Sequence, residues 1–247
     1  MNLTILGCGD AFGTGGRLQT SYHVEAGGVA VLIDCGATAL IGMQRAGLDP
    51  NRVAAIQITH LHGDHFSGLV WWLLHASHVA KRQAPLVVAG PVGIEQRVRA
   101  ASEVLFPGSM DKPVAYPLTF QEQRADERYP VGPLTVTPFE VCHPSGAPSH
   151  ALRIEHGGRV LAFSGDTEWT EALVSCARAA DLFLCECYAH ERVPRYHMNW
   201  RTLERELPRV AAKRVMLTHM AADMLAAVDE ARRAGMLIAE DGLAIEI

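Results

Sequence analysis

Short apolar runs separated by turn residues recur along the chain and predict strands that alternate with helices. The predicted strands cover residues 1–6, 21–24, 29–33, 53–59, 85–89, 134–141, 151–155, 159–164, 182–187, 214–218 and 243–247. Helices are expected at 38–46, 66–80, 93–104, 170–179, 199–210 and 223–234. The two halves repeat this order, which predicts an α/β fold with four layers: helix, sheet, sheet, helix. No linker or low-complexity segment interrupts the pattern, so we expect one domain, 1–247.

Two segments do not follow the pattern. Residues 7–16 are rich in glycine but lack the Lys-Ser/Thr of a phosphate-binding P-loop, so they favour a long loop over a phosphate cradle. Residues 106–130 contain several prolines, and the charged stretch 122–128 is predicted to be a solvated surface. The pair Gly27-Gly28 predicts a hairpin turn between the second and third strands.

Composition places the chain among ordinary globular proteins. Its 247 residues are 49% apolar and 20% charged, and the net charge of −5 argues against a strongly basic nucleic-acid surface, although a local basic patch stays open. No basic leader and no run of about 18 apolar residues is present, so we expect a cytoplasmic protein that does not bind membranes. The six cysteines form no Cys-x-x-Cys pair, which favours reduced, buried side chains over a cysteine zinc site.

The chemistry of the chain centres on four potential metal ligands within six residues. They are His60, His62, Asp64 and His65, between a predicted strand and a predicted helix. Alternate residues of an extended segment point the same way, so the first two can bind one ion together. Gly63 permits a sharp turn, after which the other two can face a second ion. Imidazole and carboxylate ligands suit zinc, with manganese or iron as alternatives.

One segment cannot fill two coordination shells, and three further candidates stand at strand exits. His143 follows the strand 134–141, Asp166 follows 159–164, and His219 follows 214–218. Several strand ends can converge on one edge of a sheet, and a carboxylate with two oxygens suits a position between two cations. These residues are therefore expected to complete a site for two divalent metal ions.

The order of these motifs resembles the metallo-β-lactamase-fold superfamily, in its phosphodiesterase branch near ribonuclease Z. The matching pieces span residues 32–219 and are Leu-Ile-Asp-Cys-Gly at 32–36, Thr-His-Leu-His-Gly-Asp-His at 59–65, His143, Phe-Ser-Gly-Asp-Thr at 163–167 and Leu-Thr-His at 217–219. The resemblance implies an αββα sandwich with the metals at one edge of the two sheets.

The resemblance also implies a division of the ligands. One ion would take His60, His62 and His143; the other would take Asp64, His65 and His219; Asp166 would bridge them. Asp34 would fix the loop and hydrogen-bond a ligand histidine, against the alternative of a simple turn carboxylate. Two ions about 3.5–4 Å apart would hold a bridging hydroxide that attacks the substrate, and Asp64 would help to orient it.

A leaving alkoxide needs a proton, and His197 is the candidate donor. The ribonuclease Z branch has an active-site histidine between the strand 182–187 and the helix 199–210. His190 is the rival, and a surface histidine is the alternative for either. The remaining histidines, at positions 23, 75, 78, 150 and 156, receive no role, and Trp71 and Trp72 are expected to pack in the core in preference to lining a pocket.

The resemblance favours a phosphodiesterase, because Asp166 stands where many zinc β-lactamases have cysteine. Typical ribonuclease Z members carry a long basic arm between the third ligand and the bridging aspartate. In this chain the interval from His143 to Asp166 is only 166 − 143 = 23 residues, too short for such an arm. A small or cyclic phosphodiester or a short oligonucleotide fits better than a large RNA. A thioesterase or lactonase, a tRNA 3′-processing endonuclease and a metal-bound sensor without turnover stay open, as does a homodimer. The loops 7–20, 106–130 and 188–198 are expected to select the substrate.

Overall fold

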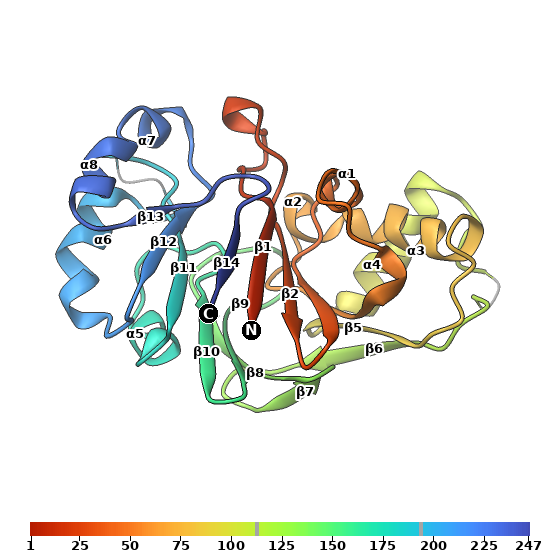
Figure 1. Ribbon diagram of the computed structural model, residues 1–247. Coiled ribbons are helices and arrows are strands. Elements are labelled where there is room, and N and C mark those ends of the chain that lie inside the picture. Colours follow the sequence, from red (N-terminus) through yellow and green to blue (C-terminus); the bar gives the residue numbers. More distant parts are fainter. Residues whose placement is uncertain (112–113, 193–194) are drawn as a thin grey trace.

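Two seven-stranded sheets packed face to face form the centre of the protein in the computed structural model, which describes residues 1–111, 114–192 and 195–247 (Figure 1). The first sheet has the order β14-β1-β2-β3-β4-β5-β6, with bounds Ala244–Glu246, Asn2–Gly7, Ser21–Ala26, Val29–Ile33, Val53–Gln57, Leu86–Pro91 and Leu118–Gln123. The second has the order β13-β12-β11-β10-β9-β8-β7, with bounds Leu237–Ile238, Val215–Thr218, Leu182–Glu186, Arg159–Phe163, Ser149–His156, Leu134–Val141 and Tyr129–Val131.

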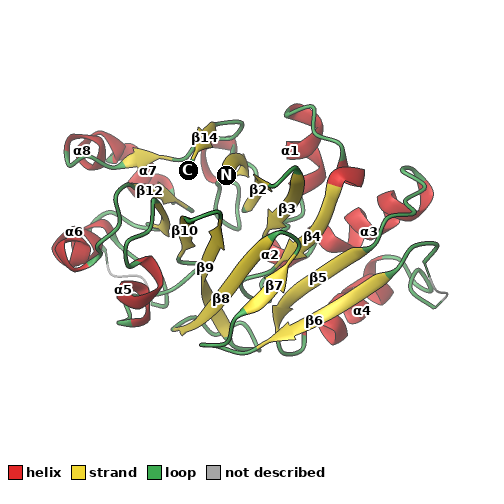
Figure 2. Ribbon diagram, turned by 60° about the horizontal axis from the view of Figure 1, so that its bottom comes forward, coloured by secondary structure: helices red, strands yellow, loops and turns green. Residues whose placement is uncertain are grey.

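Helices cover the outer face of each sheet (Figure 2). On the first sheet they are α1 (Ala39–Arg45), α2 (Gly63–Phe66), α3 (Gly68–His78) and α4 (Ile94–Leu105). On the second they are α5 (Ala172–Ala177), α6 (Trp200–Glu206), α7 (Ala222–Ala226) and α8 (Val228–Arg233). Three short 3-10 turns complete the described elements: η1 (Thr14–Gly16), η2 (Pro50–Arg52) and η3 (Leu207–Arg209). The predicted α/β fold with four layers is confirmed.

Three hydrophobic cores separate the layers. The central core joins the facing sides of both sheets, where Tyr22 of β2 meets Phe163 of β10 edge to face at 5.1 Å between ring centroids. A second core lies between the first sheet and helices α1, α3 and α4, and it contains Trp72. A third lies between the second sheet and its helices, and it contains Trp200. Each sheet is thus buried on both faces, which explains its nearly continuous apolar strands.

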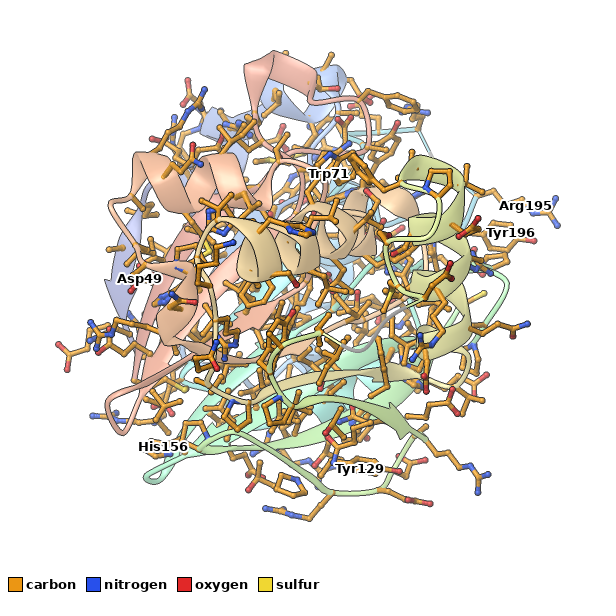
Figure 3. The ribbon with its side chains drawn as sticks, turned by 90° about the vertical axis from the view of Figure 1, so that its right-hand side faces the viewer. Asp49, Trp71, Tyr129, His156, Arg195 and Tyr196 are labelled. Carbon is orange, nitrogen blue, oxygen red and sulfur yellow. The ribbon has the colours of Figure 1, made fainter. Side chains whose placement is uncertain are left out.

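The strand directions bring several strand ends to one edge. In the second sheet β8 and β10 are both antiparallel to β9, while β10, β11 and β12 are mutually parallel, so these four strands all end at the same edge. In the first sheet β3, β4, β5 and β6 are mutually parallel. The loops that carry the candidate ligands follow β4, β8, β10 and β12. The turn between β9 and β10, near His156, lies at the far end of the sheets from the η1 loop (Figure 3).

Residues 106–130 contain strand structure that was not predicted: the edge strand β6 lies in this range, and the short strand β7 begins at its end. The charged stretch 122–128 is mostly exposed, as predicted, but it begins inside β6. Gln123 is fully buried there, and its side-chain oxygen accepts a hydrogen bond from Gln57 at 2.9 Å. Polar residues can occupy a strand when they pair in this way, and such a pairing leaves no hydrophobic pattern in the sequence.

The helix expected at 223–234 is also wrong as one continuous element. It divides at Ala227, whose backbone (φ −107°, ψ 6°) separates α7 from α8. The two-residue strand β13 was not predicted, and the helices expected at 170–179 and 199–210 are shorter, as α5 and as α6 followed by η3. The hairpin between β2 and β3 turns at Gly27 and Gly28 as predicted, with φ of 57° and 76°.

The cysteines agree with the prediction of free thiols. All six are unbonded to one another, and all except the half-buried Cys142 are buried. Among the described residues, no helix is both long and apolar enough to cross a membrane.

Candidate metal centre

The seven residues proposed from the sequence as ligands lie together at the edge where the strands end. Their potential ligand atoms form two groups, and within each group all of these atoms lie within 4.8 Å of one another. The first group has His60, His62 and His143. The second has Asp64, His65, Asp166 and His219. The structure therefore brings all seven side chains together. Two further groups overlap with these and include His197, namely His143, Asp166 and His197, and Glu186, His197 and His219.

The first group is a cluster of imidazoles at the sheet edge. Nε2 of His143 lies 2.9 Å from Nδ1 of His62, and the rings of His60 and His62 meet edge to face at 5.0 Å. Burial lowers the pKa of His60 well below its ordinary value and also lowers the pKa of His62 and His143. Neutral imidazoles are the form that binds a metal ion.

The second group surrounds two carboxylates. Nε2 of His65 lies 3.4 Å from Asp64 Oδ2 and 3.3 Å from Asp166 Oδ1, while Nε2 of His219 lies 3.2 Å and 3.4 Å from Oδ2 of the same two residues. Burial would raise the pKa of both carboxyl groups, but the histidines around them hold each pKa well below its usual range. Both are therefore ionised and can bind a cation.

Asp166 connects the two groups. Its Oδ2 is 3.9 Å from Nε2 of His60 and 3.9 Å from Nε2 of His143, while its Oδ1 faces His65 of the other group. It follows β10 directly, and Gly165 before it has φ 56°. A Cβ at Gly165 would lie 2.7 Å from the backbone oxygen of His150, so glycine permits the close approach that places this carboxylate.

Several buried polar atoms at the centre lack hydrogen bonds. Within the part of the chain that the structure describes, Nε2 of His60, Nε2 of His65 and Oδ1 of Asp166 have no partner. Buried polar atoms are nearly always satisfied, but here Nε2 of His60 lies 3.9 Å from Oδ2 of Asp166, and Nε2 of His65 lies 3.3 Å from its Oδ1. Each group thus has an unpartnered imidazole nitrogen beside a carboxylate. Divalent cations accept such donors, so the residues present fit a metal centre.

Asp34 supports the second group through a hydrogen bond to His65. It is fully buried after β3, with φ 56°, and accepts hydrogen bonds from the backbone N–H and hydroxyl of Thr59, each at 2.8 Å. Its Oδ2 lies 2.7 Å from Nδ1 of His65. This hydrogen bond places the proton on Nδ1 and leaves Nε2 of His65 free toward Asp64 and Asp166.

His197 lies beside the metal-ligand groups and is hydrogen-bonded to Glu186, a residue that was not predicted from the sequence. Its Nδ1 is 3.2 Å from Oε2 of Glu186 and 4.0 Å from Oδ2 of Asp166, and its ring stacks on Tyr188 at 4.7 Å. Burial would lower the pKa of His197, but Glu186 raises it to about 9. Glu186 is fully buried at the end of β11 and also accepts the N–H of Thr167. An acidic residue as the last residue of an apolar strand was the available signal.

The other sequence candidates lie elsewhere. His190, the rival donor, has its Nε2 2.9 Å from Oε2 of Glu230 on α8 and belongs to none of the ligand groups. Trp72 is buried in the core, as expected, whereas Trp71 is 37% exposed and meets Phe106 edge to face. The remaining histidines, at positions 23, 75, 78, 150 and 156, are also outside the ligand groups found among the described residues.

A small cavity of about 120 Å³ opens onto the centre. It is lined by residues of both ligand groups together with the η1 loop and the segment after β11, namely Ala11, Phe12, His62, Asp64, Asp166, Tyr188, His197 and His219. Of the three loops expected to select substrate, 7–20 and 188–198 therefore contribute to this cavity through described residues. The loop 106–130 instead contributes to a larger cavity of about 580 Å³ between α4 and β6. Positions 112–113 and 193–194 lie outside the described residues.

Comparison with known proteins finds relatives that match most of the chain. An uncharacterized protein of Mycobacterium leprae is 29% identical over 228 residues, covering 89% of this chain and 78% of that protein. The probable metallo-hydrolase YhfI of Bacillus subtilis is 24% identical over 227 residues, covering 89% and 87%.

Solved structures share the fold. The crystal structure of YhfI, a metallo-β-lactamase-fold protein, superposes with a TM-score of 0.83 at 20% identity and covers 100% of this chain and 98% of that one. The short form of human tRNase Z has a TM-score of 0.80 at 24% identity, with 100% and 99% covered. The profile of the family described as "Anti-Pycsar protein Apyc1" matches residues 1–242. The chain belongs to this family and is a metal-dependent hydrolase of the metallo-β-lactamase fold.

Proposed function

We propose that this protein is a phosphodiesterase with two divalent metal ions, and that its substrate is a small or cyclic phosphodiester. The observation that carries the proposal is the pair of Glu186 and His197 beside Asp166. A phosphodiester with an alcohol leaving group needs a proton at the departing oxygen, and a positioned imidazole can supply it. A thioester expels a thiolate, which is stable without a proton, so a thioesterase would gain little from a proton-donating histidine at this position.

The metal ligands follow from the two groups. His60, His62 and His143 would hold one ion, and Asp64, His65 and His219 would hold the other. Asp166, whose carboxylate faces both groups, would contribute to both. Zinc is the ion we propose, because imidazole nitrogens and carboxylate oxygens suit it. Bound there, the two ions would supply a hydroxide nucleophile at neutral pH and electrostatic stabilisation of the charge that develops on the phosphate.

The protein's own residues position the reactants. Asp64 lies between His65 and His219 and lines the cavity, where its carboxylate can orient the attacking water. His197 is held by Glu186 through Nδ1, and Nδ1 is the only atom of its ring with a hydrogen bond among the described residues. Its Nε2 can therefore donate a proton to the leaving oxygen, while the stacked Tyr188 fixes the ring plane.

The size of the site supports a small substrate. The cavity of about 120 Å³ has room for a phosphate group. Asp166 follows His143 by only 23 positions, which leaves little chain for an additional RNA-binding arm. The net charge of −5 gives no general attraction to a polyanion.

A substrate panel tests the proposal. Protein loaded with zinc or manganese should hydrolyse bis(p-nitrophenyl) phosphate and a 3′,5′-cyclic nucleotide faster than a thioester or a lactone. Opening of thioesters or lactones without phosphodiester cleavage would favour the alternative hydrolase, and full metal content without any turnover would indicate a sensor. Either result would overturn the proposal.

The role of His197 has its own test. His197→Ala should lower turnover of an alkyl phosphodiester by about 10²–10⁴-fold with metal content unchanged, and should affect p-nitrophenyl esters less because their leaving group needs no proton. His190→Ala is the matched control, since His190 is paired with Glu230 and should be dispensable. Loss of metal from His197→Ala, or equal turnover by both variants, would remove His197 as the donor.

A further inference from the structure

An aromatic side chain stands exposed beside the cavity of the metal centre. Phe12, in the loop after β1, is 82% exposed, which makes it the most exposed large hydrophobic side chain among the described residues. The loop that carries it projects at the top of Figure 1, between α7 and α2. A single exposed apolar side chain is common on protein surfaces, so exposure alone assigns no role. Two further observations do.

The first observation is that hydrogen bonds hold the backbone at Phe12. Asp10, which is 1% exposed, accepts hydrogen bonds from the N–H groups of Phe12 at 3.1 Å and Thr14 at 2.9 Å, and from the Thr14 hydroxyl at 2.6 Å. The side chain of Gln19 donates to the carbonyl of Ala11 at 3.0 Å. Gly13 follows with φ 65°, a conformation that glycine adopts without strain. An ordered backbone reduces the entropy lost when the loop binds a ligand.

The second observation is the place of Phe12. It lines the same cavity of about 120 Å³ as Asp64, Asp166 and His197. Pockets that enclose a drug-sized ligand measure about 300–1,000 Å³, so this cavity admits the reacting phosphate while the body of the substrate lies outside it. The aromatic ring at the rim is therefore next to the part of the substrate that the cavity does not enclose.

We propose that Phe12 positions the substrate by stacking on a nucleobase or a similar planar group attached to the scissile phosphodiester. The inference rests on the proposed phosphodiesterase function and adds to it a residue that would contact the part of the substrate outside the cavity. The other aromatic residue of the cavity, Tyr188, already stacks on His197. Phe12 has no such ring partner among the described residues, which leaves its face available.

A matched pair of chromogenic substrates tests this role. Thymidine 5′-(p-nitrophenyl) phosphate and methyl p-nitrophenyl phosphate share a leaving group, but only the first has a base. Phe12→Ala should raise KM for the thymidine ester about tenfold, which corresponds to ~1.4 kcal/mol of stacking, with kcat nearly unchanged and the methyl ester unaffected. Phe12→Trp should restore the low KM. Val104→Ala, a variant at an 81% exposed residue on α4, is the control and should change neither substrate.

The outcomes separate the two levels of the proposal. Equal KM values for the wild type and Phe12→Ala on the thymidine ester, or equal changes on both esters, would overturn the role of Phe12 while the phosphodiesterase stands. A Phe12→Leu variant with the wild-type KM would overturn aromatic stacking in particular. Failure of the wild type to hydrolyse either ester would overturn the phosphodiesterase and the inference with it.

Discussion

Replacing Asp34 by asparagine tests how the protein orients His65, a proposed metal ligand. Asp34→Asn preserves the side-chain size, and asparagine tolerates the positive φ of 56° at this position better than most residues. The change removes one acceptor oxygen from a carboxylate that faces three donors, two on Thr59 and one on His65. If the asparagine oxygen keeps the hydrogen bonds to Thr59, its NH2 group opposes the N–H of His65 Nδ1.

The consequence is a change of tautomer or of ring position at His65. To accept a hydrogen bond from the asparagine, Nδ1 must lose its proton, and the proton then moves to Nε2, which faces Asp64 and Asp166. A protonated Nε2 cannot bind a metal ion. Loss of such supporting hydrogen bonds lowers metal affinity about 10–100-fold, which corresponds to ~1.4–2.7 kcal/mol.

Competition with a chromogenic chelator measures this change directly. The Asp34→Asn variant should bind its more weakly held ion about 10–100-fold less tightly than the wild type. Asp49→Asn is the control, because Asp49 is an exposed carboxylate that caps η2 at Asn51. Wild-type affinity in a folded Asp34→Asn protein would refute the reasoning, since His65 would then not depend on Asp34.

Three other substitutions test separate parts of the structure. Glu186→Gln removes the charge that holds His197 and should lower turnover of alkyl phosphodiesters about tenfold with metal content unchanged; unaltered kinetics would contradict this. Gly68→Ala would place a Cβ 2.1 Å from the backbone oxygen of Gly36, so thermal unfolding should begin several degrees lower, with ~2 kcal/mol lost from the free energy of unfolding. Burial lowers the pKa of His150 to about 4, so between about pH 6.5 and pH 4 the unfolded chain binds a proton at this residue and the folded chain does not. The free energy of unfolding therefore decreases as the pH is lowered through this range. His150→Gln should remove ~2 kcal/mol of the stability lost between pH 7 and 5, measured by urea unfolding; the same pH slope in both proteins would disprove this.

The seven proposed ligands could be found from the sequence because each has a local signal. The four in residues 60–65 are dense enough to need a chemical explanation, and His143, Asp166 and His219 each follow a predicted strand. Their convergence depends on strand directions, which the sequence does not state. The expected αββα arrangement supplied these directions. In the structure β8, β10 and β12 run parallel to one another and end at the same edge of the sheet.

The missed features have weak local signals or none. Glu186 reads as the end of an apolar strand, and only the structure brings its buried carboxylate to His197, 11 positions later in the chain. The edge strand β6 contains Gln123, whose burial depends on a hydrogen bond to Gln57 far away in sequence. The division of α7 from α8 occurs at Ala227, where neither glycine nor proline marks a break. Each depends on a tertiary contact or a backbone angle that periodicity does not encode.

Anomalous scattering from crystals grown with zinc tests the central claim most directly. Data collected at the zinc absorption edge should show two peaks per chain, one among His60, His62 and His143 and the other among Asp64, His65 and His219, with Asp166 between them. No peak at the carboxyl ends of β8, β10 and β12, or a peak held by other residues, would contradict the two-metal centre.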